Sequence, residues 1–302
     1  MTLELAANLL TIMAPVLICA ALGFTWKRLG KPFHTDMVAA IVINIASPCL
    51  VFSTLTGAKV SAAAMAEVAG AFLAAFAATI VIAYLFLRAA KLPITNYLPS
   101  LIFGNSGNMG LPLCLFAFGQ DGLALGIAVF TVNSLFQFTL GQVLNAGELS
   151  LKPVLRTPII YAVTLALVFV LTATPVPQFL FNTIQVLGQI AIPLMLLALG
   201  VSLASLRVRQ LGMSVLMSFV RIVMGFIVGV AVAWAFGLEG AARGVIIIQC
   251  AMPVAVFNYL FAVYYKRDAE QIAGLVVVSS LVSFATLPLL LVVALDPTIL
   301  PF

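Results

Sequence analysis

Residues 104–112 read Gly-Asn-Ser-Gly-Asn-Met-Gly-Leu-Pro, and they lie inside an apolar run that is predicted to span a membrane over 95–118. Loop-forming residues are tolerated at membrane depth only where the backbone is buried in protein or lines a wet cavity. Unwinding here leaves a half-helix N-terminus, whose free N–H groups and positive dipole end favour an anion. The stretch therefore predicts a broken membrane helix with an anion-binding end.

The rest of the chain has the composition of an integral membrane protein. Of its 302 residues, 64% are hydrophobic and 8% are charged, against about 25% charged residues in a soluble domain. Apolar runs of about 20 residues recur along the whole chain, the length needed to cross a bilayer. They predict ten spans: 5–25, 37–56, 62–87, 95–118, 121–144, 157–174, 180–204, 213–236, 240–264 and 271–295. The first run has Glu4 and no basic residue before it, so we expect a mature helix rather than a signal peptide.

Basic residues alternate between the connections that join these spans. The even-numbered connections hold Lys59 and Arg243 alone. The odd-numbered connections hold eleven basic residues: Lys27, Arg28, Lys31, Arg88, Lys91, Lys152, Arg156, Arg207, Arg209, Lys266 and Arg267. The positive-inside rule then predicts a multi-pass protein of the cell (inner) membrane with both termini on the non-cytoplasmic side. The dispersal of these charges argues against nucleic acid as a partner.

Prolines preceded by a side-chain amide recur at a nearly constant offset. Four prolines follow an amide by four residues: Pro48 after Asn44, Pro112 after Asn108, Pro193 after Gln189, and Pro253 after Gln249. The copies are 145 and 141 residues apart, and Asn133-Ser134 recurs as Ser279-Ser280 after 146 residues. A repeat of five helices must enter the membrane from the opposite side in its second copy, which is typical of alternating-access transporters. We expect 1–150 and 151–302 to be the two halves.

A proline inside a helix removes a hydrogen bond and opens the helix, and a nearby carboxamide can donate to the opened backbone or to a ligand. For Pro48 and Pro193 we favour a simple kink, because such kinks are common. For 105–112 together with 249–253 we favour a binding site, because both copies of the repeat break there.

The motif GNSGNMGLPL at 104–113, with Pro-Val-Ala-Val-Phe-Asn-Tyr at 253–259 and Thr-Leu-Pro-Leu at 286–289, resembles the auxin efflux carrier family. That family includes plant PIN proteins and bacterial permeases for malonate-like and malate-like acids, and the resemblance covers the full chain. It implies an all-α fold of ten helices with crossing, Pro-broken helices 4 and 9, similar to bile-acid symporters and sodium/proton antiporters. It also implies a homodimer with a scaffold of helices 1, 2, 6 and 7 and a transport domain of helices 3–5 and 8–10.

Aligned on Pro112 and Pro253, the family motif implies that Asn105 and Gln249 contact the substrate. Asn258 falls where the plant branch carries Lys, which argues against auxin itself, and the long cytoplasmic loop of the plant branch is absent. The expected substrate-binding residues are Asn105, Asn108, Gly110, Pro112, Asn133, Gln137, Gln249, Pro253 and Asn258.

Other polar residues lie within the predicted spans. Asn133, Ser134 and Gln137 share one helical face, and they either line the site or only bond neighbouring helices. Arg221 is the one charge well inside a span. We favour snorkelling to the interface, or bracing of a broken-helix carbonyl end, over a direct counter-charge role toward an organic anion. Gly225 and Gly229 form a G-x-x-x-G that predicts close helix packing.

The distribution of reactive residues narrows the function. All nine acidic residues lie in or near connections or span ends, which argues against a cation pump of the antiporter type. We expect a carrier of a small organic anion, a mono- or dicarboxylate, moved by alternating access. A sodium- or proton-coupled symporter is the alternative. A single histidine, His34, and four cysteines without C-x-x-C spacing predict no metal site. No paired Asp, Ser-His or H-E-x-x-H set lies within the spans, so we expect no enzyme activity, no catalytic residues and no cofactor.

Overall fold

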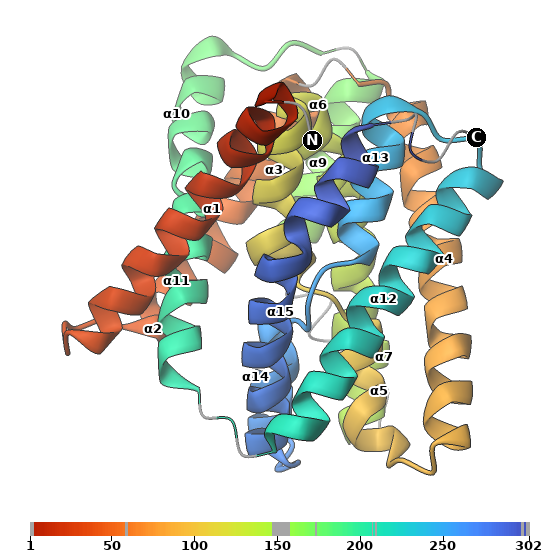
Figure 1. Cartoon of the computed structure of the whole chain (residues 1–302). Helices are drawn as coiled ribbons and strands as arrows, with labels where there is room; N and C mark the ends of the chain where they lie inside the picture. The colour runs from red at the N-terminus through yellow and green to blue at the C-terminus, as the bar shows by residue number, and fades with distance from the viewer. Residues whose placement is uncertain are drawn as a thin grey trace.

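The computed structural model describes residues 3–57, 60–146, 158–172, 174–206, 208, 210–296 and 299. Within these ranges every regular element is a helix, and Figure 1 shows the helices gathered in one bundle. Several basic residues of the predicted connections lie outside the described residues: Lys59, Lys152, Arg156, Arg207 and Arg209. The first residue of the predicted sixth span, at 157, lies outside them too. The fold is therefore all-α, as the composition predicts.

The elements of the first half of the chain, with η marking π-helical turns, are α1 (Leu3–Arg28), α2 (Thr35–Ile41), η1 (Val42–Ala46), α3 (Ser47–Gly57), α4 (Ala62–Ala89), α5 (Ile94–Ile102), η2 (Ser106–Gly110), α6 (Leu111–Phe138) and α7 (Leu140–Ala146). The second half contains α9 (Pro158–Leu171), α10 (Gln178–Gln189), α11 (Ala191–Ser205), α12 (Leu211–Ala235), α13 (Gly240–Cys250), α14 (Val256–Tyr264) and α15 (Ala269–Leu295).

Seven helices of the described chain are long and apolar enough to cross a membrane: Leu9–Arg28, Thr35–Gly57, Ala62–Ala89, Ser106–Phe138, Gln178–Ser205, Leu211–Ala235 and Ala269–Leu295. Large apolar side chains point outward from the bundle, among them Leu171 at 73% and Phe179 at 76% exposure. Such surfaces suit lipid, whose tails are as apolar as leucine. The chain is therefore a multi-pass membrane protein.

The predicted ten spans and the seven long helices differ at identifiable places. The range Ser106–Phe138 joins two helices across a kink at Gly119, whose φ is 65° and ψ −153°, and it covers parts of the predicted fourth and fifth spans. Only glycine adopts that backbone conformation without strain, and Gly119 lies between the two predicted spans. The predicted sixth span is represented by the 14 residues of α9, and the ninth is divided into α13 and α14.

Pro48 and Pro193 lie where the backbone stays close to helical, whereas from the sequence we favoured a simple kink at each. The chain stays helical from α2 through η1 into α3, so the π-turn absorbs the hydrogen bond that Pro48 lacks. Between α10 and α11 the single residue Ile190 keeps φ −73° and ψ −15°, close to helical values. Neither proline opens the backbone.

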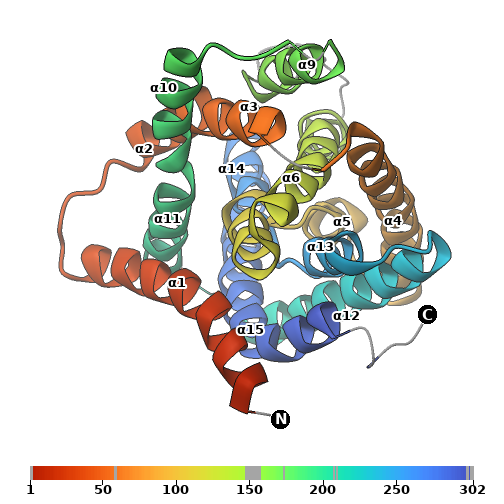
Figure 2. The ribbon, with the colours of Figure 1, turned by 90° about the horizontal axis from the view of Figure 1, so that it is seen from above.

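The helices pack in two groups. In one group α1 packs against α11, and α3 packs against α9 and α10. In the other, α12 packs against α13 and α15, and α4 packs against α5 and α6. Figure 2 shows the first group along one side and the second group around α5 and α6. Most of the site described below belongs to the second group.

Candidate functional site

Two helices of the second group are interrupted at facing positions. Residues 103–105 are not helical between α5 and η2, and residues 251–255 are not helical between α13 and α14. Gly104 and Val254 form an antiparallel bridge. Backbone N–H groups also donate across it, from Asn105 to Pro253 C=O at 2.7 Å and from Ala255 to Phe103 C=O at 3.1 Å. We call residues 103–105 and 253–255 the paired segments. Their N–H and C=O groups have no partners within the interrupted helices, and the two segments satisfy these groups by bonding each other.

From the sequence we expected Pro112 and Pro253 to lie at equivalent places in the two breaks, and the structure differs. Pro253 lies within a paired segment. Pro112 instead lies two residues after the π-turn η2, in backbone that is helical from Ser106 onward, so the π-turn absorbs the hydrogen bond that Pro112 lacks, as at Pro48. The break ends at Asn105, because the π-turn Ser106–Gly110 already restores helical structure. The predicted break over 105–112 is therefore corrected to 103–105.

Two side chains from neighbouring helices satisfy the paired segments. The Asn133 amide nitrogen on α6 donates to the carbonyl of Gly104 at 3.5 Å. The Ser279 hydroxyl on α15 accepts from the N–H of Val254 at 3.0 Å. The sequence left open whether these residues line the site or bond neighbouring helices. Both bond the opened backbone, and so they help to hold its geometry.

Asn258, on α14, closes the end of α5. Its amide nitrogen donates to the carbonyls of Pro99 at 3.2 Å and Phe103 at 3.4 Å. Both carbonyls lie at the C-terminal end of α5. The carbonyl of Pro99 also accepts from the N–H of Phe103, and the carbonyl of Phe103 also accepts from the N–H of Ala255. Asn258 is therefore a capping residue at the break, a role that its sequence position alone did not indicate.

Arg221 is buried beside the paired segments, at 3% exposure. The predicted snorkelling to the interface is therefore wrong. A Cβ at Gly104 would overlap a terminal nitrogen of the guanidinium, and Gly225 lets the carbonyl of Cys250 pack directly against α12. Arg221 thus lies where α5 and α13 end, in the position of a brace for their carbonyl ends. Gly229 also packs closely on α13, against Cys250 and Ile247, as the G-x-x-x-G predicts.

Gln249 reaches from α13 to η2. A Cβ at Gly110 would overlap its side-chain oxygen, so only glycine leaves room for this approach. Its amide nitrogen donates to the Cys114 sulfur at 3.5 Å. The structure therefore brings Gln249 and Gly110 together. Of the other amides four residues before a proline, Asn44 and Gln189 are exposed and Asn108 is half-buried.

Several buried side chains in this region keep a polar atom with no hydrogen-bond partner. These atoms are Ser100 Oγ, Asn105 Nδ2, Gln137 Nε2, Arg221 Nε, Gln249 Oε1 and Asn258 Oδ1. An unpartnered buried polar atom costs about 1–3 kcal/mol, so native proteins rarely leave one without water or a ligand. Asn105 is 4% and Gln249 1% exposed. Donors and acceptors are both present, so the group suits a ligand with polar oxygens.

Two helices also begin at the paired segments, so their N-termini lie there. Asn105 precedes η2, which continues into α6, and Ala255 precedes α14; neither end has a side-chain cap. Each N-terminus carries a partial positive charge of about +0.5. No Asp or Glu is among the buried residues in the described part of the chain. The electrostatics of this region therefore favour a negative ligand.

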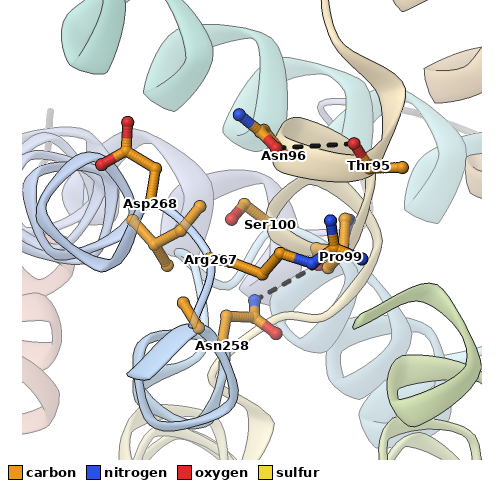
Figure 3. A pocket seen from close by; sticks show the side chains of 9 residues that line it. Thr95, Asn96, Pro99, Ser100, Asn258, Arg267 and Asp268 are labelled. Atoms are coloured by element: carbon orange, nitrogen blue, oxygen red, sulfur yellow. Dashed lines mark hydrogen bonds between the residues drawn. The ribbon is translucent and has the colours of Figure 1, made fainter. Parts of the chain in front are cut away.

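A small pocket, which we did not predict from the sequence, lies beside the break. It contains about 270 Å³ of empty space, including its open mouth. Its lining residues are Thr95, Asn96, Pro99, Ser100, Asn258, Ala262, Arg267, Asp268 and Ile272. Figure 3 shows Arg267 extending across it toward Pro99, with Asn258 below and Ser100 above. Ser100, a hydroxyl next to Pro99 inside a predicted span, was the available sequence signal.

Comparison with known proteins gives a consistent family. The profile of the family described as membrane transport protein matches residues 8–150 and 142–291. An uncharacterized transporter of Methanothermobacter thermautotrophicus is 25% identical over 288 residues, covering 91% of this chain and 94% of that protein. An uncharacterized transporter of Methanocaldococcus jannaschii is 25% identical over 298 residues, covering 91% and 95%. The chain belongs to the auxin efflux carrier family of membrane transport proteins.

Proposed function

We propose that this transporter is a secondary carrier of a small organic anion, a mono- or dicarboxylate, which binds at the paired segments. The observation that carries the proposal is the unpartnered, buried Asn105 amide at an uncapped helix N-terminus. A carboxylate there would accept from Asn105 Nδ2 and from the free N–H groups that follow it. Gln137 Nε2, also unpartnered and buried, is the second donor.

The other expected site residues have narrower roles in this proposal. Gln249 offers its unpartnered oxygen to a hydroxyl or a protonated carboxyl of the ligand. Gly110 leaves room for Gln249, and Asn108 lies on η2, half-buried beside the same turn. Pro112 and Pro253 shape the backbone. Asn133 and Asn258 hold it open.

The architecture that we propose is an inverted repeat of five helices, 1–150 and 151–302. Ten spans then result, with α5 and η2–α6 as the broken fourth helix and α13 and α14 as the broken ninth. Asn133 and Ser279 support this, since they are 146 residues apart and each bonds one of the paired segments. Alternating access would follow from movement of helices 3–5 and 8–10 against a scaffold of helices 1, 2, 6 and 7.

We further propose a homodimer in the inner membrane with both termini on the non-cytoplasmic side. The orientation rests on the distribution of basic residues between connections. Arg28, Lys31, Arg88, Lys91 and Arg267 then lie on the cytoplasmic side. The dimer rests on the family resemblance. Fusion of a periplasmic reporter to the C-terminus checks the orientation.

Sodium- or proton-coupled symport is a second candidate, and the pocket of Figure 3 is its one supporting feature. Ser100 Oγ and Asn258 Oδ1 are unpartnered oxygens that suit a cation. Arg267 lines the same pocket and opposes a cation there. Uptake into proteoliposomes that is indifferent to imposed sodium and pH gradients would remove this candidate.

The site assignment is tested by Asn105→Ala and Gln249→Ala. Each is expected to lower counterflow of labelled succinate in proteoliposomes by about 10–100-fold, because a hydrogen bond to a charged group contributes about 1.5–3 kcal/mol. Asn44→Ala and Gln189→Ala are matched controls. These amides also precede a proline by four residues but are exposed, and Asn44 donates to Ala40 on its own helix. Unchanged counterflow in both site variants would refute the assignment.

A further inference from the structure

We propose that the substrate is carried as a monoanion and that Arg221 is the residue that sets this charge. The inference rests on the proposed function, because it takes the ligand to be an organic anion at the paired segments. The preference for a monoanion follows from the charges and helix ends that lie at the paired segments. These are one guanidinium, two helix C-termini and two helix N-termini.

Arg221 and the two C-termini offset each other. The guanidinium contacts Gly104, just beyond the end of α5, and faces Cys250, the last residue of α13. Each helix C-terminus carries a partial charge of about −0.5. The two ends together therefore match the single positive charge of Arg221. This explains how the arginine is accommodated at 3% exposure with its Nε unpartnered.

The partial positive charges of the two helix N-termini have no negative group opposite them in the described part of the chain. The helix that begins at Ser106 and the nine-residue α14 both start at the paired segments, and neither has a side-chain cap. Each N-terminus carries about +0.5, so together they match one negative charge. The unpartnered Asn105 amide marks the place where that charge is received. A dianion would leave an unpaired negative charge in a region of low dielectric constant.

Other charged groups do not alter this balance. The titratable group that faces Arg221 is the Cys250 thiol. Arg243 lies on α13 seven residues before Cys250, about 10 Å away along the helix, and it has a partner of its own. Arg267 and Asp268 are adjacent at the pocket of Figure 3 and carry opposite charges. No buried carboxylate from α4, α5, α13 or α15 faces Arg221.

The test uses three molecules of nearly equal shape and different charge. At pH 7.5 succinamide is neutral, succinamate is a fixed monoanion and succinate is a dianion. Affinities of the purified full chain are measured by titration with thermal unfolding as the readout. Succinamate is expected to bind at least about tenfold more tightly than succinamide or succinate. A tenfold difference in affinity is what one partly screened charge interaction contributes. Succinate is expected to bind more tightly as the pH falls and its monoanion accumulates.

Variants of Arg221 test whether this residue causes the preference for a monoanion. Arg221→Gln removes the positive charge, so the optimum is expected to shift to succinamide. Arg221→Lys keeps the charge and is expected to keep the order of the wild type. If Arg221→Gln does not fold, the wild-type series with Arg221→Lys still decides the ligand charge.

The failures are distinguishable. If succinate binds more tightly than succinamate at pH 7.5, the monoanion inference is overturned while the anion carrier stands. An unchanged order in a folded Arg221→Gln protein overturns the role of Arg221. Absence of binding by all three molecules and by a panel of other carboxylates, measured in parallel, overturns the proposed function together with the inference.

Discussion

Replacement of Gly104 by alanine is expected to lower transport by about 100-fold or more while the protein still folds. The added Cβ would overlap the Arg221 guanidinium and come within 3.3 Å of the Met252 carbonyl oxygen. The guanidinium is the far end of a flexible side chain, so it moves in preference to the backbone. Stability should fall by only about 1–3 kcal/mol, as for other overpacked sites. The displacement of a charged group by about 1 Å is enough to cost 100-fold in function.

Counterflow in proteoliposomes and thermal unfolding of the purified variant measure these two effects separately. Gly212→Ala is the matched control, because α12 also carries Arg221 and a Cβ at Gly212 meets open space. The double variant Gly104→Ala with Arg221→Gln should show no further loss relative to Arg221→Gln. Transport at the wild-type rate in Gly104→Ala would contradict the proposed position of Arg221.

Replacement of Gly200 by alanine is expected to destabilise the protein by about 3 kcal/mol, the upper part of the usual range for overpacking. A Cβ there would overlap the carbonyl oxygen of Ala20 and lie 2.8 Å from the backbone nitrogen of Phe24. Gly23 makes the reciprocal contact with the carbonyl oxygen of Leu197. These contacts involve backbone atoms, so relief requires α1 and α11 to move apart.

The expected fall in the midpoint of thermal unfolding is roughly 5–10 °C. Gly70→Ala is the control, since Gly70 lies within α4 and a Cβ there meets open space. It should leave stability unchanged or raise it by about 0.5–1 kcal/mol, the cost of glycine in a helix. Equal midpoints for Gly200→Ala and Gly70→Ala would show that α1 and α11 tolerate separation.

The sequence predicted the location of the site better than its chemistry. The Gly- and Asn-rich stretch from Gly104 to Pro112 does contain a break, but only at Gly104 and Asn105, because residues 106–112 are helical. The exact break was missed. It lies at 103–105, since a π-turn over 106–110 was not foreseeable from side-chain types. The capping role of Asn258 and the pocket at Arg267 were likewise not predicted, because both depend on which helices meet.

The sequence by itself determined that this chain is a multi-pass, all-α membrane protein, since composition and the length of apolar runs reflect the bilayer directly. It also marked four amides before prolines, and the repeat favoured Asn108 and Gln249 over Asn44 and Gln189 as site residues. The tertiary structure then showed that Asn44 and Gln189 are exposed, Asn108 is half-buried and Gln249 is buried. It also placed Arg221 at the ends of two broken helices rather than at the interface. The reason is physical: local patterns fix where a helix weakens, whereas charge compensation depends on groups that are distant in the chain and adjacent only after packing.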